Sequence, residues 1–181
     1  GDHLNFVTEG AEILWPTYTQ ALDYEIEIGF VITKPLMNAS AEEALQAIGG
    51  FVIVNDISAR DVQLAEMGSG FGPQKSKHFI NVMSSQVVTA DEILPRINRL
   101  KAEIRINGKT VRATGSDFRH HSIADALVHV SKGAQLHPGE LFATGTLPGG
   151  CALENDNWLK VGDRIELFID RIGALTNTIV G

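Results

Sequence analysis

The chain has 181 residues, a formal net charge of -7 and an isoelectric point near 5.3. This acidic balance argues against a nucleic-acid partner, which favours a basic surface, and no apolar run approaches the roughly 20 residues that a membrane-spanning helix needs. With 44% hydrophobic residues, the chain is expected to form one globular domain, residues 1–181, around a sizeable core. The single cysteine, Cys151, excludes an internal disulfide, and without a signal-peptide pattern the expected location is the cytoplasm.

Residues 7–22 show little periodicity and are predicted to be a loop, whereas residues 23–30 alternate strictly between apolar and polar positions. A period of two is typical of a strand. Glu25 and Glu27 therefore share one face, about 6.6 Å apart at ~3.3 Å per residue. Two carboxylates at that spacing can converge on one hard cation, with Gly29 leaving room on the same face, or they can lie on a solvated outer face.

A capping box begins the next element, because the Ser40 hydroxyl can accept from the Glu43 amide while the Glu43 carboxylate reaches back. It predicts a short helix that Gly49-Gly50 ends. Residues 51–54 are a continuous apolar run, which is typical of a strand buried on both faces. This predicted strand leads directly into Asn55-Asp56.

The middle of the chain is polar and rich in glycine over residues 57–81, and it lacks the ending of a phosphate-binding loop. We expect a mobile loop over a site here. Residues 87–89 are predicted to form a short strand and residues 90–95 a turn.

The last third of the chain contains a strong hairpin signal, Asn107-Gly108, between two predicted strands. Ser122 is expected to cap a second helix that Gly133 closes. Many strands, two short helices and no alternation of strand and helix predict a mixed α/β, β-rich domain. The other expected strands are a buried run at residues 141–144, an alternating run at 164–169 and an edge strand at 172–177.

Asp56 follows the predicted buried strand, and a carboxylate in that position is costly to bury unless it is paired or holds a metal. It can also cap the next turn. Glu25, Glu27 and Asp56 together form a set of ligands with oxygen atoms only. Mg²⁺ and Mn²⁺ prefer that chemistry, and Ca²⁺ also fits it, whereas zinc would favour histidine and cysteine.

Several segments, in chain order, resemble signatures of the fumarylacetoacetate hydrolase family. They are the Asp-Tyr-Glu-Ile-Glu of residues 23–27, the Asn-Asp-Ile-Ser-Ala-Arg-Asp-Val-Gln of residues 55–63, and residues 144–154, with a closing pattern at 162–177. Each piece alone is weak, but the ordered set is specific. The resemblance implies a β-roll with short flanking helices, a homodimer, and Mg²⁺ or Mn²⁺ held by carboxylates matching Glu25, Glu27 and Asp56.

The same resemblance implies roles for further residues. In the family, the metal chelates the oxo groups of a 2-oxo or 1,3-diketo acid. Arg60 and Gln63 match residues that line the substrate site, and their spacing of three lets both reach a substrate carboxylate from one helical turn. The alternative for Arg60 is an ion pair with Asp61 or Glu66. Thr146 matches a threonine whose hydroxyl touches the substrate.

The family's active-site lysine matches Lys77, although Lys75 is also a candidate for the substrate site. An ammonium at this position would stabilise an enolate oxygen, whereas the alternative is a solvated lysine pair on a flexible loop. Glu154 matches a glutamate that some hydrolases use to orient the general base. Lys77 and Glu154 are therefore the predicted catalytic residues.

Two departures from the family affect the expected reaction. The histidine and acid that activate water in hydrolytic members lie upstream of the acidic strand, where nothing here matches, so the chain is a fragment, is completed elsewhere, or does not hydrolyse. The second departure is at residues 84–86, which are Ser-Ser-Gln where many family members carry a Pro-Trp pair near the site. The first expectation is a metal-dependent hydrolase that cleaves a C–C bond of an acylpyruvate or fumarylacetoacetate-like diketo acid. The alternatives are an isomerase, hydratase or decarboxylase of a 2-oxo acid, and a catalytically inactive metal-binding homologue.

Overall fold

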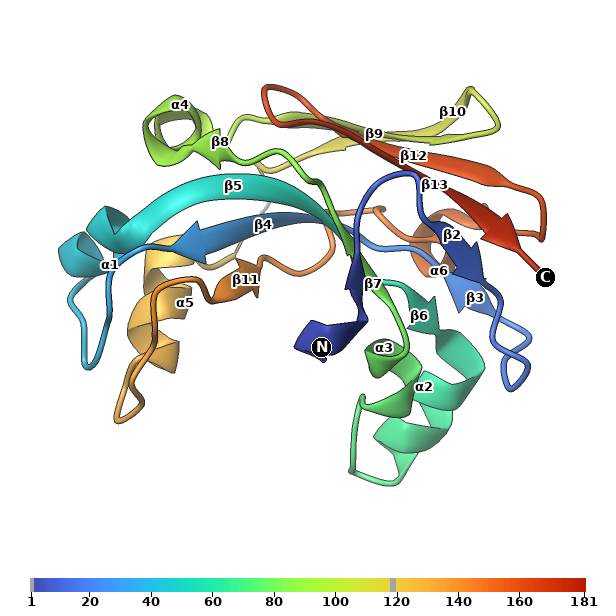
Figure 1. Cartoon of the computed structure of the whole chain (residues 1–181), viewed down its shortest axis with the longest axis horizontal. Helices are drawn as coiled ribbons and strands as arrows, with labels where there is room; N and C mark the ends of the chain where they lie inside the picture. Colours follow the sequence, from blue (N-terminus) through green and yellow to red (C-terminus); the bar gives the residue numbers. More distant parts are fainter. Residues whose placement is uncertain (1, 118–119) are drawn as a thin grey trace.

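The computed structural model describes residues 2–117 and 120–181. Two sheets lie face to face, with the long strands β4 (Ile26–Ile32) and β5 (Ile48–Asn55) crossing beneath the second sheet (Figure 1). The predicted mixed, β-rich fold is confirmed. The first sheet has the order β1 (Phe6–Val7), β7 (Asn81–Met83), β5, β4, β11 (Leu141–Ala143), with β8 (Val88–Thr89) also on β5; the second has the order β10 (Lys109–Gly115), β9 (Lys101–Ile106), β12 (Arg164–Ile169), β13 (Gly173–Val180), β2 (Glu12–Leu14).

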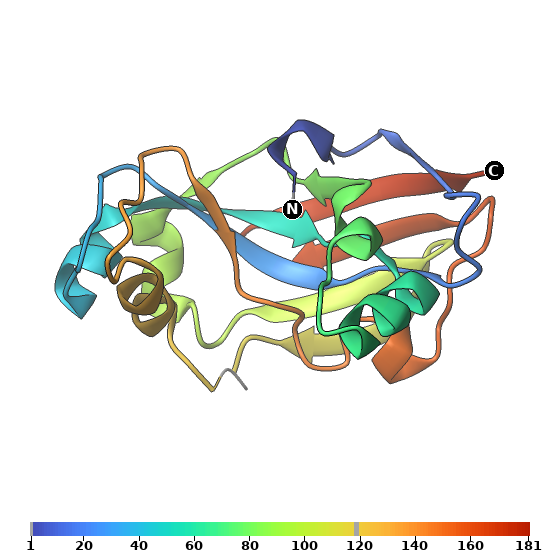
Figure 2. The ribbon, with the colours of Figure 1, turned by 90° about the horizontal axis from the view of Figure 1, so that it is seen from below.

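Two pairs of helices flank these sheets (Figure 2). One pair, α1 and α5, packs together at one end of the molecule, and the other, α2 and α3, lies beside the two-stranded sheet of β3 and β6. No helix in the described parts of the chain is both long and apolar enough to cross a membrane. The bounds are η1 (His3–Asn5), β3 (Leu22–Asp23), α1 (Ala41–Ala47), β6 (Ser58–Ala59), α2 (Arg60–Gly68), α3 (Lys75–His78), α4 (Ala90–Ile93), η2 (Leu94–Arg96), α5 (Ile123–Val130) and α6 (Ala152–Asn155).

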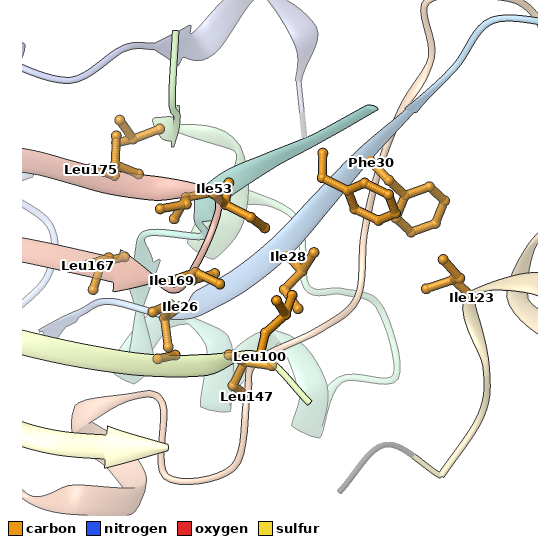
Figure 3. Close-up of a cluster of buried hydrophobic side chains, with 14 of the residues drawn as sticks. Ile26, Ile28, Phe30, Ile53, Leu100, Ile123, Leu147, Leu167, Ile169 and Leu175 are labelled. Atoms are coloured by element: carbon orange, nitrogen blue, oxygen red, sulfur yellow. The ribbon is translucent and has the colours of Figure 1, made fainter. Parts of the chain in front are cut away.

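The core lies between the two sheets, where branched side chains from both interdigitate (Figure 3). Ile26 and Ile28 of β4 and Ile53 of β5 face Leu167 of β12 and Leu175 of β13, and all five are buried. Burying each such side chain contributes about 1.5–3 kcal/mol. This apolar layer buries the long strands β4 and β5 along almost their whole length.

Strand β4 follows the predicted alternation, but its second face is also buried. Glu25 and Glu27 are only 8% and 5% exposed, so the solvated-face alternative is wrong. Gly29 does not leave space for a ligand, because a Cβ there would lie 2.6 Å from Val52 and 2.7 Å from Val54 side-chain atoms. The glycine instead lets these two valines pack over β4.

Helix α1 has the predicted capping box between Ser40 and Glu43. The expected stop at Gly49-Gly50 is wrong, because the helix ends at Ala47 and both glycines belong to β5. A Cβ on Gly49 would lie 2.2 Å from Thr33, and one on Gly50 would lie 2.8 Å from the Val88 carbonyl oxygen. These glycines therefore allow close packing between strands rather than a helix end.

Residues 57–81 are not the expected mobile loop, because they contain β6, α2, α3 and the start of β7. Helix α2 has no buried residue, so no apolar stripe marks it in the sequence. The short segment at 90–95 is likewise helical rather than a turn.

The second sheet contains the predicted hairpin, where Asn107 and Gly108 adopt positive φ angles of 53° and 78°. The strand expected at 172–177 is present as β13, but it is not an edge strand along its whole length, because β2 pairs with its residues 178–180. Strand β2 pairs with β13 in parallel and comes from residues expected to be a loop. Its three residues are too short to give a periodic signal.

Strand β11 of the first sheet is only half-buried, contrary to the expected buried run. Helix α5 begins at the predicted Ser122 cap.

Candidate metal centre

Three carboxylates converge at one end of the β4–β5 pair. Ile26 and Asn55 are directly opposite in the antiparallel register, which brings Glu25 beside Asp56. The Asp56 amide donates to the Glu25 carbonyl at 3.1 Å, and the Glu25 amide donates to the Asn55 side-chain oxygen at 3.1 Å. Each of Glu25, Glu27 and Asp56 offers a carboxylate oxygen, and these oxygens all lie within 4.8 Å of one another.

Lys77 of α3 reaches this cluster from the opposite wall. Its Nζ lies 2.6 Å from Glu25 Oε2 and 2.8 Å from Asp56 Oδ2. Burial alone would raise the pKa of Glu25, but the Lys77 ammonium and the Arg60 guanidinium together hold that pKa below its ordinary value. Burial, reinforced by the Glu25 carboxylate, raises the pKa of Asp56 despite the contact with Lys77.

Glu27 is the least compensated member of the cluster. Burial, and then the negative charges of Asp56 and Glu25, raises the pKa of Glu27 to about 8. The backbone of Gly145 donates a hydrogen bond to its carboxylate. The neighbouring cation, Lys77, contacts the other two carboxylates and not Glu27. Without a bound metal ion, Glu27 is therefore the carboxylate that is protonated most easily.

Arg60, the first residue of α2, links Glu25 to Asp23. Its Nε donates to Asp23 Oδ2 at 2.7 Å, its Nη1 donates to Gln63 Oε1 at 2.8 Å, and its Nη2 lies 2.8 Å from Glu25 Oε1 as an ion pair without hydrogen-bond geometry. Asp23 is fully buried and also accepts from the Ala152 amide at 2.7 Å. Arg60 therefore forms ion pairs, as the alternative expected, but with Asp23 and Glu25 and not with Asp61 or Glu66.

The charges of this cluster fit a divalent cation. Four carboxyl groups, those of Asp23, Glu25, Glu27 and Asp56, meet the cations of Lys77 and Arg60, so the fully ionised cluster carries a charge of -2. Buried, unbalanced carboxylates are costly unless they are protonated or coordinate a metal. Oxygen-only donors match the preference of Mg²⁺ and Mn²⁺. The residues therefore fit the group that the sequence predicts.

A cavity of about 300 Å³ is lined by Glu27 and Asp56, and a second cavity of about 430 Å³ lies beyond Ala143, which lines both. Thr146, expected to touch the substrate, lines the second cavity together with His121. The first cavity is lined by Phe6, Glu27, Val54, Asp56, Pro73, Lys77, His78, Asn81, Leu141 and Ala143.

Two of the predicted site residues lie apart from the carboxylates. Lys75 Nζ stacks 4.5 Å from the centre of the Tyr18 ring, while its near neighbour Lys77 contacts Glu25. Glu154 is exposed on α6. The structure thus brings Arg60 and Lys77 to the carboxylates and Gln63 to Arg60, and the catalytic and substrate-binding roles stay predictions.

The structure also adds residues that the sequence analysis did not single out. Asp23, the first residue of the alternating stretch, anchors both Arg60 and the start of α6. His78 and Asn81 line the metal cavity, and Asn81 donates to the Lys77 carbonyl at 3.0 Å. In the sequence, only their proximity to Lys77 indicates that His78 and Asn81 belong to the site.

Comparison with known proteins places the chain in a broader context. Residues 2–180 match the family model for the fumarylacetoacetate (FAA) hydrolase C-terminal region. Oxaloacetate tautomerase YisK of Bacillus subtilis is 36% identical over 162 residues, covering 89% of this chain and 53% of that protein. Human mitochondrial oxaloacetate tautomerase FAHD2A is 29% identical over 170 residues, covering 93% and 54%. The chain spans about half the length of the curated relatives it matches.

Solved structures share the fold over nearly the whole chain. A fumarylacetoacetate hydrolase from Exiguobacterium antarcticum superposes with a TM-score of 0.87 at 28% identity, covering 98% of this chain and 63% of that one. Fumarylpyruvate hydrolase from Pseudomonas aeruginosa, in complex with Mn²⁺ and pyruvate, gives 0.84 at 24% identity, covering 97% and 73%. At 24% identity, the similarity to the Pseudomonas aeruginosa enzyme shows a shared fold only.

Proposed function

This chain belongs to the fumarylacetoacetate hydrolase family, and on that premise we propose that it is a divalent-metal-dependent enzyme that interconverts the keto and enol forms of a 2-oxo dicarboxylic acid such as oxaloacetate. The observation that carries the proposal is the buried set of Glu25, Glu27 and Asp56 with Lys77 between two of its members. The names of the Bacillus subtilis and human relatives support this substrate. The hydrolase expected first from the sequence is the second candidate.

Glu25, Glu27 and Asp56 would hold the cation, and Mg²⁺ and Mn²⁺ suit their oxygen donors. When bound, that cation would supply Lewis-acid chemistry, drawing electrons from the 2-oxo group of the substrate. Glu27 has to give up its proton before it serves as a ligand, since its pKa is about 8 in the metal-free protein. The protein therefore releases a proton as it takes up the cation at neutral pH.

Tautomerisation moves one proton between C3 and the 2-oxo oxygen and breaks no C–C bond. Lys77 Nζ lies in the wall of the metal cavity and has three N–H donors, two of which contact Glu25 and Asp56. An ammonium in this position would donate to the substrate oxygen as its negative charge grows. Arg60 would keep Glu25 oriented through its contact with Asp23, and Arg60 and Gln63 stay candidates for the substrate carboxylate.

C–C bond hydrolysis of an acylpyruvate-like acid is the second candidate, favoured by the name of the Exiguobacterium antarcticum relative. The two cavities that meet at Ala143 would give such a longer substrate room. Hydrolysis also needs a base that activates water, which tautomerisation does not. The homodimer and the cytoplasmic location stay predictions, and the vertebrate relatives are named as mitochondrial.

The test is a turnover screen with Mg²⁺ or Mn²⁺ on two kinds of substrate. Enol-oxaloacetate is followed by the loss of its ultraviolet absorbance, and acylpyruvates and fumarylpyruvate are followed by the pyruvate they release. We expect metal-dependent loss of the enol that chelator removes. Pyruvate release without enol loss would favour the hydrolase, and activity in neither assay with tight metal binding would favour the inactive homologue.

A further inference from the structure

Helix α3, which carries Lys77, is too short to hold its own shape. It has four residues, and its preceding residue Gln74 makes no side-chain capping bond. An isolated helix of this length is unstable in water, because nucleation costs more than one turn of hydrogen bonds returns. The position of Lys77 must therefore come from contacts outside α3.

Glu66 of α2 supplies the missing cap. Its carboxylate accepts from the backbone amides of Gln74 at 3.0 Å, Lys75 at 2.7 Å and Ser76 at 3.3 Å, and from the Ser76 hydroxyl at 2.5 Å. One side chain thus satisfies the free amide donors at the start of α3 and places a negative charge where the helix dipole favours it. The Ser76 hydroxyl is the main reason that the pKa of Glu66 is lowered.

The chain between the two helices is shaped to this contact. Gly72 has a φ of +146°, and a Cβ there would lie 2.7 Å from the Glu66 Cβ. The backbone therefore lies directly against the stem of Glu66 before it turns over the carboxylate. At the other end of α3, Asn81 of β7 donates to the Lys77 carbonyl at 3.0 Å. Lys77 lies between these two tethers.

We propose that Glu66 is a positioning residue, which sets Lys77 Nζ between Glu25 and Asp56 by capping α3 from the neighbouring helix. Its consequence for turnover rests on the proposed function of Lys77, whereas its effect on the place of Lys77 does not. Glu66 lies in the same helix as Arg60, which contacts Glu25. Helix α2 therefore supports one carboxylate through Arg60 and one cation through Glu66.

The first test needs no metal and no substrate. In the metal-free protein, the two carboxylate partners of Lys77 Nζ protect it from an acylating reagent. Mass spectrometry reports the labelling rate of each lysine. Glu66→Ala should raise the rate at Lys77 about tenfold, as expected for the loss of hydrogen bonds to a charged group, while Lys160 serves as an internal reference. Glu43→Ala, which removes the matched capping carboxylate of α1, should leave the rate at Lys77 unchanged.

The second test couples Glu66 to Lys77 through the metal and the reaction. Removing the ammonium by Lys77→Met should strengthen Mn²⁺ binding in calorimetry, because a cation beside the site competes with the metal. Glu66→Ala should shift Mn²⁺ affinity in the same direction and lower kcat by roughly 10- to 100-fold, the range for partners that orient site residues, with little change in KM. In the Lys77→Met background, Glu66→Ala should change neither quantity further. Glu66→Gln, which keeps one acceptor oxygen, should fall between.

Two results would overturn the proposal. One is an unchanged labelling rate at Lys77 in a Glu66→Ala protein that retains the wild-type circular dichroism spectrum. The other is additivity of Glu66→Ala and Lys77→Met in Mn²⁺ affinity. If Glu66→Ala fails to fold, Ser76→Ala removes only the hydroxyl contact and should still raise the Lys77 rate above that of Glu43→Ala. A wild type that labels as expected but lacks turnover would contradict the proposed function alone.

Discussion

The carboxylate cluster lies between two walls, the β4–β5 pair and the α2–α3 pair, which are built in opposite ways. The β4–β5 wall is buried on both faces, so that even Glu25 and Glu27 are under 10% exposed. The α2–α3 wall contains only one buried residue, Ser76. The first wall holds the carboxylates through a ladder of backbone hydrogen bonds, and the second holds Arg60 and Lys77 through side-chain tethers.

This difference separates the binding of a cation from its use. The ligand oxygens are carried by elements that core packing fixes, so they should keep their places when the helices are altered. The cations depend on a few hydrogen bonds that Asp23 and Glu66 accept, each of which contributes about 1.5–3 kcal/mol when one partner is charged. Changes in the helices should therefore alter turnover more than they alter the fold.

The largest expected effect is on metal affinity in the sheet wall. Asp56→Ala removes one of three carboxylate ligands and should weaken Mn²⁺ binding by more than about 100-fold, beyond the loss caused by removing a partner of a ligand. Isothermal titration calorimetry measures it. Asp61→Ala is the matched control, because Asp61 binds Thr19 and Gln20 away from the carboxylates. Equal affinity in both variants would remove Asp56 from the site.

The next effect belongs to the helix wall. Lys77→Met should lower turnover by roughly 100-fold, as for the loss of one donor to a developing oxyanion. Lys75→Met should change it little, because Lys75 Nζ stacks on Tyr18 and does not contact the carboxylates. Steady-state kinetics on enol-oxaloacetate gives both values. A larger loss in the Lys75 variant would assign the two lysines the other way round.

Glycines in the two walls should respond in opposite directions. Gly29→Ala in β4 forces a Cβ against Val52 and Val54 and should lower the free energy of unfolding by about 1–3 kcal/mol. Gly68→Ala at the end of α2 has no atom within 4 Å and should raise it by about 0.5–1 kcal/mol. Urea unfolding of both variants measures the difference. A similar loss in both would mean that α2 packs as tightly as β4.

The smallest expected effect is a pH dependence of the metal-free protein. The pKa of Glu27 is raised from 4.5 to about 8, so its protonated form favours the folded state. That contribution is fully present below pH 4.5 and is lost as the pH rises through 8. Glu27→Gln removes this titration, so its free energy of unfolding should fall less than the wild-type value between pH 6 and pH 8. Parallel curves from urea unfolding would contradict the raised pKa.

The sequence predicts well what depends on neighbouring residues. The capping boxes at Ser40 and Ser122 and the Asn107-Gly108 hairpin occur as expected, because their contacts close within a few residues. The convergence of Glu25 and Asp56 required more, namely that two strands pair in one register. Local alternation and the position after a buried strand gave that indication, and family resemblance made it specific.

The sequence does not reveal contacts that close over long distances without an apolar pattern. Helix α2 escaped detection because none of its residues is buried. Strand β2 is three residues long and exists through parallel pairing with β13, about 166 residues further along the chain. The roles of Asp23 and Glu66 as tethers follow from hydrogen bonds across turns and sheets that no spacing rule encodes.

The claim that the β4–β5 wall holds a divalent cation has one direct test. Crystals of the wild-type protein grown with Mn²⁺ give an anomalous difference map that locates the metal without reference to activity. We expect one strong peak within coordination distance of the carboxylates of Glu25, Glu27 and Asp56, with Lys77 Nζ displaced from at least one of its partners. A map with no peak there, or with the peak on other residues, would contradict the account.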